Sequence, residues 1–178
     1  MIKDGLLSNA IYISSPHYNL RPMNAIIDLL VIHCASLPEG EFANNNIEKL
    51  FCGTMAIHEQ KELGLSGDLK VSSHVYIKRC GEIIQFVNFN KRAWHAGQSS
   101  FEGKENCNDY SVGIELQGTV NENFTDEQYV SLINVTKNIL NYYPQISKGR
   151  IIGHADIAPV RKADPGEFFD WQYYLKHI

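Results

Sequence analysis

The chain has 178 residues, of which 44% are hydrophobic and 20% are charged, and its formal net charge is −4 at pH 7. This composition excludes a disordered chain. A length close to the ~150 residues of a usual domain predicts one domain spanning residues 1–178, with an extended N-terminal arm over about residues 1–25. The negative charge, without any run of Lys and Arg, argues against nucleic acid and membrane surfaces as partners.

The N-terminus and the cysteines indicate a compartment. Asp4 and Gly5 interrupt the first apolar residues, where a signal peptide needs an unbroken apolar stretch, and nothing later approaches the ~18 apolar residues of a membrane span. The 4 cysteines are scattered without a C-x-x-C pair, which predicts neither a disulfide framework nor a cysteine zinc site. We therefore expect a cytoplasmic protein with free thiols.

The first elements expected along the chain are an extended arm and a buried strand. Residues 8–25 show no hydrophobic period and are interpreted as an arm laid across the domain. Residues 26–33 form a nearly continuous apolar run, which is typical of a central strand covered on both faces. The run ends in His33, before a turn at residues 37–40, so we expect His33 at the C-terminal end of the strand, facing a cleft.

The next part of the chain predicts a short helix, a long loop and a hairpin. Residues 46–54 carry apolar side chains on one side of a helix, whereas residues 55–70 lack a clear period and are interpreted as a long loop beside the site. Residues 71–79 alternate in polarity, and residues 82–87 follow after a turn at a glycine, so we expect a β-hairpin.

The second half of the chain contains the strongest signals. Residues 111–117 alternate, with apolar side chains facing one way and Glu115 the other, which predicts a strand. Residues 126–143 have the apolar stripe of an amphipathic helix, and Thr125 with Gln128 forms a capping box at its start. Two further short elements are expected, a strand at residues 151–152 and a helix at residues 170–175. Strands interleaved with helices predict an α/β (α+β) fold with a mixed central β-sheet flanked by helices.

A metal site is expected at the strand ends. The short strand at residues 151–152 leads into a polar stretch that proline residues make rigid, and this stretch contains His154 and Asp164. If His33 and His154 end adjacent strands and the loop returns Asp164 to them, two imidazoles and a carboxylate form a zinc site with an open fourth position, as in catalytic zinc sites. Zinc in such a site lowers the pKa of bound water to ~7, which allows hydrolysis.

Two further residues have the chemistry that hydrolysis needs. Lys162 precedes Asp164 by two residues and is placed to stabilise an oxyanion. Glu115 is a carboxylate within an apolar strand and is a candidate general base that passes a proton to a leaving amine. From the pattern alone, Glu115 is equally well a solvated residue on the outer face of its strand.

Several segments resemble the zinc-dependent N-acetylmuramoyl-L-alanine amidases. Among these enzymes the sequence is most similar to the cytosolic AmpD type, which acts on 1,6-anhydro-N-acetylmuramyl peptides in cell-wall recycling. The similarity covers most of the chain. It is carried by residues 71–77, 93–97, 111–116 and 153–166, together with parts of the N-terminal arm and residues 37–42 and 107–109.

The resemblance implies a mixed sheet with flanking helices, a Zn²⁺ cofactor and a muropeptide substrate. The reaction would be cleavage of the amide between the lactyl group of the sugar and L-alanine. The implied zinc ligands are His33, His154 and Asp164, with Glu115 and Lys162 catalytic.

The resemblance also implies a substrate groove, in which Trp94 offers an aromatic face to the sugar. The chain departs from the family there. Cys34 stands where the family usually has an asparagine that contacts substrate, and the expected basic residues of the groove are replaced by Lys70 and by the neutral Asn106. These replacements leave the zinc chemistry intact and bear on affinity for the peptide and preference for the sugar.

Two alternatives remain open at this point. His154 and Asp156 can begin a 2-His-1-carboxylate iron site, for which His177 is the available second histidine. A non-catalytic muropeptide-binding module on the same fold is the other alternative. Of the remaining histidines, His74 and His95 are expected to be packed near the site or to support it, whereas His17, His58 and His177 are expected at the surface.

Overall fold

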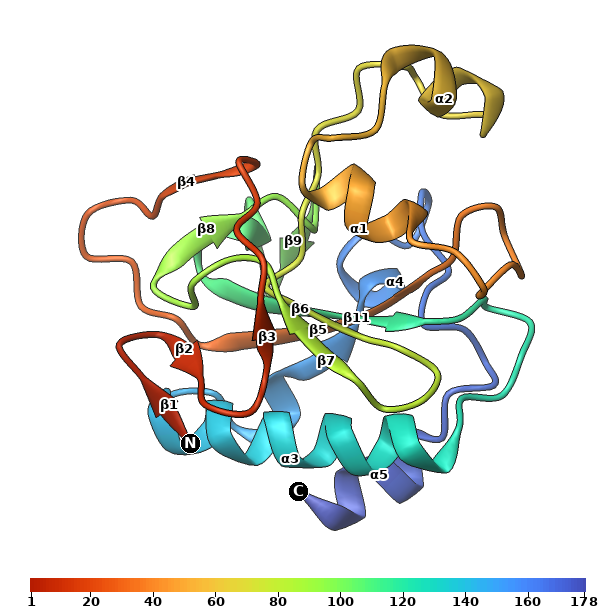
Figure 1. Cartoon of the computed structure of the whole chain (residues 1–178). Helices are drawn as coiled ribbons and strands as arrows, with labels where there is room; N and C mark the ends of the chain where they lie inside the picture. The colour runs from red at the N-terminus through yellow and green to blue at the C-terminus, as the bar shows by residue number, and fades with distance from the viewer.

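The computed structural model describes residues 1–178 and is built around a six-stranded mixed sheet with the order β12-β5-β11-β6-β7-β3 (Figure 1). Its strands are β3 (Ile11–Tyr12), β5 (Leu29–Ala35), β6 (Val75–Ile77), β7 (Ile83–Gln85), β11 (Ser111–Gln117) and β12 (Ile151–Gly153). The four strands β12, β5, β11 and β6 are parallel to one another, and β7 is antiparallel to β6. The predicted mixed sheet is confirmed.

Helices and short hairpins surround this sheet. The helices are α1 (Asn46–Phe51), α2 (Ile57–Glu62), α3 (Asp126–Tyr142), α4 (His154–Ile157) and α5 (Trp171–His177), with 3-10 turns at Cys107–Asp109 and Lys148–Arg150. Three two-stranded sheets pair β1 (Ile2–Lys3) with β2 (Leu6–Leu7), β4 (Tyr18–Leu20) with β8 (Lys91–Ala93), and β9 (Ser100–Phe101) with β10 (Lys104–Glu105). In Figure 1, α3 and α5 lie below the sheet, and α1 and α2 lie above it.

Helix α3 begins where its capping box predicts. The backbone N–H of Gln128 donates to Thr125 Oγ1 at 3.1 Å, and the Thr125 N–H donates to Gln128 Oε1 at the same distance. Leu132 and Ile139 lie on its inner stripe and are fully buried. The expected helix at the C-terminus is also present as α5, because the Asp170 carboxylate accepts the Tyr173 N–H at 2.8 Å. No helix of the chain combines the length and apolar character needed to cross a membrane.

The pleat of the two central strands gives the sheet two different faces. One face is apolar, and the other carries polar side chains next to a smaller apolar cluster. Leu30 and Ile32 of β5 point into the large apolar cluster that α3 and α5 cover, while Leu29 and Val31 point into a different cluster on the opposite face. His33 follows the same alternation as Leu29 and Val31. Because β5 and β11 are paired in register with Glu115 opposite His33, both polar side chains lie on one face of the sheet.

The structure corrects several expected boundaries. Strand β5 continues past His33 to Ala35, so His33 lies within the strand near its C-terminal end. The expected strand at residues 71–79 is shortened to β6, because the main chain before it bonds to loops, as in the 3.2 Å bond from Ser72 N–H to Trp94 O. The expected long loop at 55–70 contains helix α2, and the N-terminal arm contributes the edge strand β3.

Candidate active site

Three side chains from distant parts of the chain converge on one point. His33 Nδ1 lies 2.9 Å from His154 Nδ1 and 3.2 Å from an Asp164 carboxylate oxygen, and the same oxygen lies 3.1 Å from His154 Nδ1. The three residues are 2%, 3% and 8% exposed. They come from strand β5, from the first residue of helix α4 and from the loop that follows it.

The loop from α4 to Asp164 is held by main-chain and side-chain hydrogen bonds. The Ala155 N–H donates to the Asp164 carbonyl oxygen at 3.0 Å, which folds the loop back onto the start of α4. Asp156 accepts the Gly153 N–H at 2.7 Å through its carboxylate, so Asp156 orders the helix start and does not join the converging atoms. The expected loop at residues 153–166 therefore opens with one turn of helix.

These atoms are suited to bind a metal ion. Ligands of one tetrahedral zinc at 2.0–2.1 Å sit about 3.3 Å from each other, close to the separations observed here. The second nitrogen of each imidazole has its own partner: His154 Nε2 donates to the Ala96 carbonyl at 3.1 Å, and His33 Nε2 lies 2.9 Å from His95 Nδ1. The Nδ1 atoms of both rings face the Asp164 carboxylate, and this buried cluster can hold a cation between the three groups.

The protonation states of the cluster also suit metal binding. Burial lowers the pKa of His33 to about 4, although its contact with the Asp164 carboxylate acts in the opposite direction. Burial favours the neutral form of Asp164, but its close contacts with the His154 and His33 imidazoles outweigh burial and hold the pKa of this carboxyl below its usual range. A neutral imidazole and an ionised carboxylate are the forms that bind metals.

Glu115 lies beside this cluster, in surroundings that raise the pKa of its carboxyl group. One carboxylate oxygen is 3.9 Å from His33 Nδ1, and the side chain is 12% exposed. Burial, followed by the nearby charge of Asp164, raises the pKa of Glu115 to about 8, while Lys162 acts to lower it. Glu115 is thus not a solvated residue on an outer face, and a pKa near neutrality suits a group that exchanges protons.

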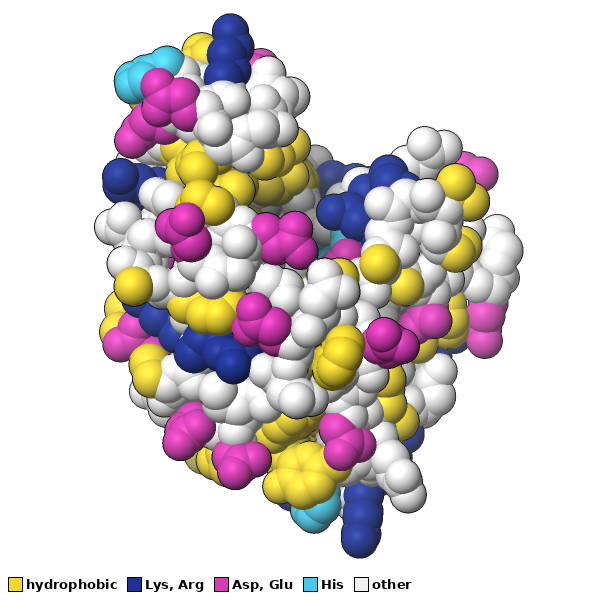
Figure 2. All heavy atoms as spheres, turned by 90° about the vertical axis from the view of Figure 1, so that its right-hand side faces the viewer, with side chains coloured by type: hydrophobic (Ala, Val, Ile, Leu, Met, Phe, Trp, Pro, Cys, Tyr) yellow, Lys and Arg dark blue, Asp and Glu magenta, His cyan; other side chains and the backbone are white.

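The cluster forms part of the floor of a cavity of about 470 Å³. Leu65, Leu69 and Val71 belong to its apolar wall, while Lys70, Arg161 and Lys162 supply positive charge. Figure 2 shows this side of the molecule as a hollow below the projecting segment that carries α2, with Lys and Arg side chains gathered on the opposite rim. An apolar wall facing a cationic rim suits a ligand with both apolar and anionic groups.

Trp94 lines the cavity and rests on the N-terminal arm. Its ring stacks on His17 with a centroid distance of 6.0 Å, and its Nε1–H donates to Asn19 Oδ1 at 2.9 Å. The expectation of a surface position is wrong for His17, which is 8% exposed because it packs between Trp94 and the Val71 carbonyl, 3.0 Å from its Nδ1. His58 and His177 are exposed as expected.

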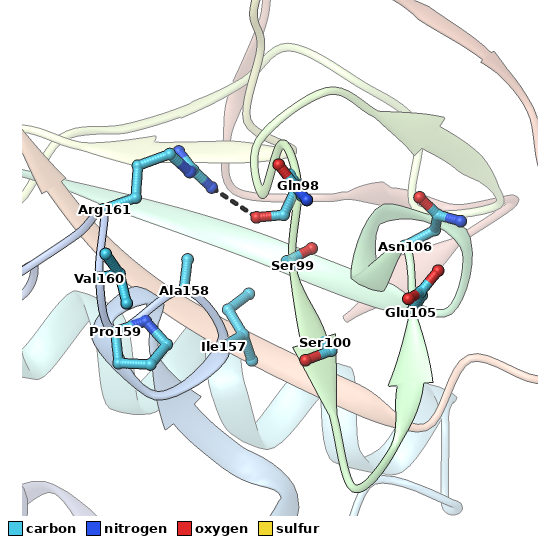
Figure 3. Close-up of a pocket in the computed structure, with 10 residues that line it drawn as sticks. All are labelled: Gln98, Ser99, Ser100, Glu105, Asn106, Ile157, Ala158, Pro159, Val160 and Arg161. Atoms are coloured by element: carbon cyan, nitrogen blue, oxygen red, sulfur yellow. Dashed lines mark hydrogen bonds between the residues drawn. The ribbon is translucent and has the colours of Figure 1, made fainter.

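The other expected substrate residues are not all brought together. Cys34 and Lys70 line the cavity, with Cys34 Sγ 3.7 Å from the Pro165 carbonyl oxygen and Lys70 at the exposed rim. Asn106 lies instead in a second pocket of about 420 Å³, between the β9–β10 hairpin and the loop after α4 (Figure 3). Arg161 lines both cavities and donates to the Gln98 carbonyl oxygen at 2.9 Å.

Sequence reasoning missed the arginine that ties the N-terminal arm to the site. Arg21 donates to the carbonyl oxygens of Phe89, Asn108, Asp109 and Ser111 at 2.9–3.1 Å. Burial lowers the pKa of this guanidinium to about 10. The only signal in the sequence was the Arg21-Pro22 pair, which the resemblance included but to which no role was assigned.

The residues of the alternative iron site do not meet. His177 lies near the exposed end of α5, where its Nδ1 is 2.7 Å from the Tyr173 carbonyl oxygen, and α5 packs with α3 on the other face of the sheet. Asp156 is engaged with the Gly153 N–H. The group of side chains that could hold a metal ion therefore consists of His33, His154 and Asp164.

Comparison with known proteins identifies the same family as the motifs. A family model described as N-acetylmuramoyl-L-alanine amidase matches residues 22–167. The 1,6-anhydro-N-acetylmuramyl-L-alanine amidase AmpD of Haemophilus influenzae is 46% identical over 177 residues, which are 99% of this chain and 96% of that protein. AmpD of Escherichia coli K12 is 47% identical over 171 residues, covering 96% and 93% of the two chains. These matches confirm the resemblance.

Solved structures agree with the sequence comparison. A crystal structure of a selenomethionine AmpD derivative superimposes with a TM-score of 0.95 at 45% identity, covering 100% of this chain and 99% of the other. The amidase AmiD from E. coli, solved with the substrate anhydro-N-acetylmuramic acid-L-Ala-D-gamma-Glu-L-Lys, has a TM-score of 0.66 at 30% identity and covers 88% of this chain and 60% of its own.

Proposed function

The chain belongs to the N-acetylmuramoyl-L-alanine amidase family, and on that premise we propose that it is a zinc-dependent hydrolase of muropeptides. It cleaves the amide between the lactyl group of (1,6-anhydro-)N-acetylmuramic acid and L-alanine, in cell-wall recycling. The observation that carries this proposal is the convergence of two imidazole nitrogens and a carboxylate oxygen within 3.2 Å of one another, at the floor of a cavity. The AmpD relatives, similar over nearly the whole chain, support the substrate class.

His33 and His154, each through Nδ1, and Asp164, through its carboxylate, would hold the zinc ion. Three protein ligands leave one position open, as catalytic zinc requires. Zinc in such a site supplies Lewis acidity, which makes water a better nucleophile and polarises a carbonyl group.

The remaining chemistry falls to Glu115 and Lys162. Glu115 takes the proton that the attacking water loses and delivers it to the nitrogen of L-alanine, so that the amide C–N bond breaks to give a carboxylic acid and an amine. Lys162 places a positive charge near the carbonyl oxygen, where negative charge develops as water adds. Lys162 lines the same cavity as His33 and Glu115, which supports this placement.

The cavity lining supports substrate roles for three of the predicted residues. Trp94 provides an aromatic face for the sugar, and Lys70 provides a cation for a carboxylate of the peptide. Cys34 replaces a polar contact with a weakly polar thiol. Asn106 lines the second pocket, on the other side of Arg161 from the proposed metal site. It would therefore contact the substrate only where the substrate extends into that pocket.

We further propose that the whole chain acts as one domain in the cytoplasm, on small muropeptides. The AmiD complex with a muropeptide supports this class of ligand.

The test is hydrolysis of a synthetic 1,6-anhydro-N-acetylmuramyl peptide by purified protein, with chelator and after zinc is restored. We expect activity that is lost with chelator and regained with zinc. Binding without turnover by fully zinc-loaded protein would instead identify a non-catalytic binding module. Comparing anhydro and reducing-end substrates then defines the sugar preference.

A further inference from the structure

A chain of hydrogen bonds leads from the main chain to His33, and its direction can be assigned link by link. Ser111 Oγ lies 2.6 Å from the Cys107 carbonyl oxygen, which can only accept, so the hydroxyl hydrogen points there. Ser111 Oγ must then accept from His95 Nε2, 3.1 Å away. Because a neutral imidazole carries one hydrogen, His95 Nδ1 is left with a lone pair.

The last link determines which nitrogen of His33 carries its hydrogen. His95 Nδ1 is 2.9 Å from His33 Nε2, and since His95 Nδ1 accepts, His33 Nε2 is the donor. His33 Nδ1 is then the nitrogen without hydrogen, and it faces His154 and Asp164. The Ser111 hydroxyl, two hydrogen bonds away from His33, thus controls which nitrogen atom His33 offers to a metal.

The two proposed metal ligands His33 and His154 differ in how the position of their ring hydrogen is fixed. His154 Nε2 meets the Ala96 carbonyl oxygen, which can only accept, so one contact is enough to leave His154 Nδ1 free. His33 meets another imidazole, which can either donate or accept. If His95 donated, His33 Nδ1 would carry the hydrogen and bond to Asp164 in place of a metal. Ser111 removes this possibility.

The absence of a side chain at Gly113 makes room for the His95 ring. A Cβ atom at this position would lie 2.5 Å from His95 Cγ and 2.6 Å from His95 Nδ1, closer than atoms can approach. Gly113 lies on β11, where its partner on β5 is Val31, two residues from His33. The missing side chain therefore lets the His95 ring lie against the sheet at the height where it reaches His33.

We propose that Ser111 and His95 are positioning residues that fix the tautomer of His33 and so prepare its Nδ1 for zinc. This inference rests on the proposed zinc site, but not on the identity of the substrate. Outer partners of metal-binding histidines typically contribute ~10–100-fold to metal affinity. Ser111 does not contact His33 directly. A change in zinc affinity on substitution of Ser111 would therefore act through the tautomer of His33 and not through a lost contact with a metal ligand.

The test is zinc affinity, measured by competition with a chromophoric chelator, for the wild type, Ser111→Ala and Ser73→Ala. Ser73 is the matched control because its hydroxyl is equally buried and donates to a main-chain oxygen, Gly113 O at 2.8 Å, but unlike Ser111 it makes no hydrogen bond with a histidine. We expect Ser111→Ala to lower zinc affinity ~10-fold or more and Ser73→Ala to leave it within ~3-fold. Equal affinities for the two variants would overturn the proposal.

Variants of His95 and the nitrogen signals of the histidines keep the proposal testable if Ser111→Ala does not fold. His95→Asn retains an acceptor near the Nδ1 position, whereas His95→Leu removes it, so we expect the asparagine variant to bind zinc ~10-fold more tightly or better. In long-range ¹H–¹⁵N spectra of metal-free wild type, His33 and His95 should both carry hydrogen on Nε2. Hydrogen on His33 Nδ1 would refute the inference. Loss of amidase activity with normal zinc affinity would refute the proposed function alone.

Discussion

The two faces of strands β5 and β11 show how one pair of strands serves both stability and chemistry. On one face, Ile32 and Leu116 are fully buried in the apolar cluster between the sheet and α3. On the other, His33 and Glu115 lie opposite each other in the paired strands. Neighbouring residues of the same strand therefore enter different environments, because successive side chains of a strand point to opposite faces.

The difference shows what each face requires. The apolar face depends on volume and shape, so its residues are replaceable at a cost in stability. The polar face depends on identity, because a buried imidazole or carboxylate is tolerated only with specific partners. Substitutions on the two faces should therefore separate chemistry from stability.

The largest expected effect follows removal of a proposed metal ligand. His33→Ala, His154→Ala or Asp164→Ala should abolish zinc retention and reduce kcat/KM by far more than the ~10–100-fold typical of outer partners. Zinc content after gel filtration and turnover of the anhydro-muramyl peptide measure the effect. Asp156→Asn, a nearby carboxylate that does not reach the cluster, is the control. A variant that kept both zinc and activity would remove its residue from the ligand set.

A smaller effect on turnover is expected from substitution of Glu115 or Lys162, the two residues that we propose to be catalytic. Glu115→Gln should lose ~10²–10⁴-fold in kcat, as for a general base. Lys162→Ala should lose ~10²–10³-fold, as for an oxyanion donor. Zinc content should stay at one ion per chain, because neither side chain belongs to the cluster of ligands. Full activity in Glu115→Gln would show that the proton moves by another route.

On the packed face, the effect should fall on stability. Leu116→Ala should lower the free energy of unfolding by ~2–5 kcal/mol, because it leaves a cavity in a fully buried site. Urea unfolding measures this loss, while zinc affinity and kcat of the folded protein should change little. If Leu116→Ala lost zinc as readily as His33→Ala, the separation between the two faces would be disproved.

The most subtle effect is on the pH dependence of stability in metal-free protein. Because the pKa of Glu115 is about 8 in the folded protein and ~4.3 in an unfolded chain, folded protein holds a proton that unfolded protein has released between these values. Stability should therefore fall as pH rises through this window, by at most ~1.4 kcal/mol per pH unit from this group.

Glu115→Gln should remove that contribution, because glutamine resembles the protonated acid and does not titrate. Urea unfolding at several pH values between 5 and 8, in the presence of chelator, compares the slopes of the two proteins. Glu41→Gln makes the same chemical change at an exposed position and serves as the control. Parallel slopes for wild type and Glu115→Gln would mean that Glu115 is ionised in the folded protein throughout.

The elements that sequence predicts well are those whose signals are local. The alternation at residues 111–117 matches β11 in both bounds, and the capping box places the start of α3. The convergence of His33, His154 and Asp164 was also expected, because buried strands and a proline-rich loop limit where these side chains can go. The resemblance then named the roles that chemistry alone left open for Glu115 and Lys162.

What sequence did not predict depends on contacts between distant segments. Helix α2 was missed because Ile57 is exposed and only Gln60 of its residues is buried, so it has no apolar stripe. His17 is buried by Trp94, which lies far along the chain. The strand at residues 71–79 was overestimated because alternation does not reveal whether a partner strand is available.

The anchored arm has a practical meaning for anyone who shortens this protein. The family match begins at residue 22, immediately after Arg21, so trimming to that boundary would delete the guanidinium that four carbonyl oxygens share. It would also delete His17, the ring on which Trp94 rests. A truncated chain that matched the family boundary would have lost the residues that hold the Trp94 ring in place at the cavity.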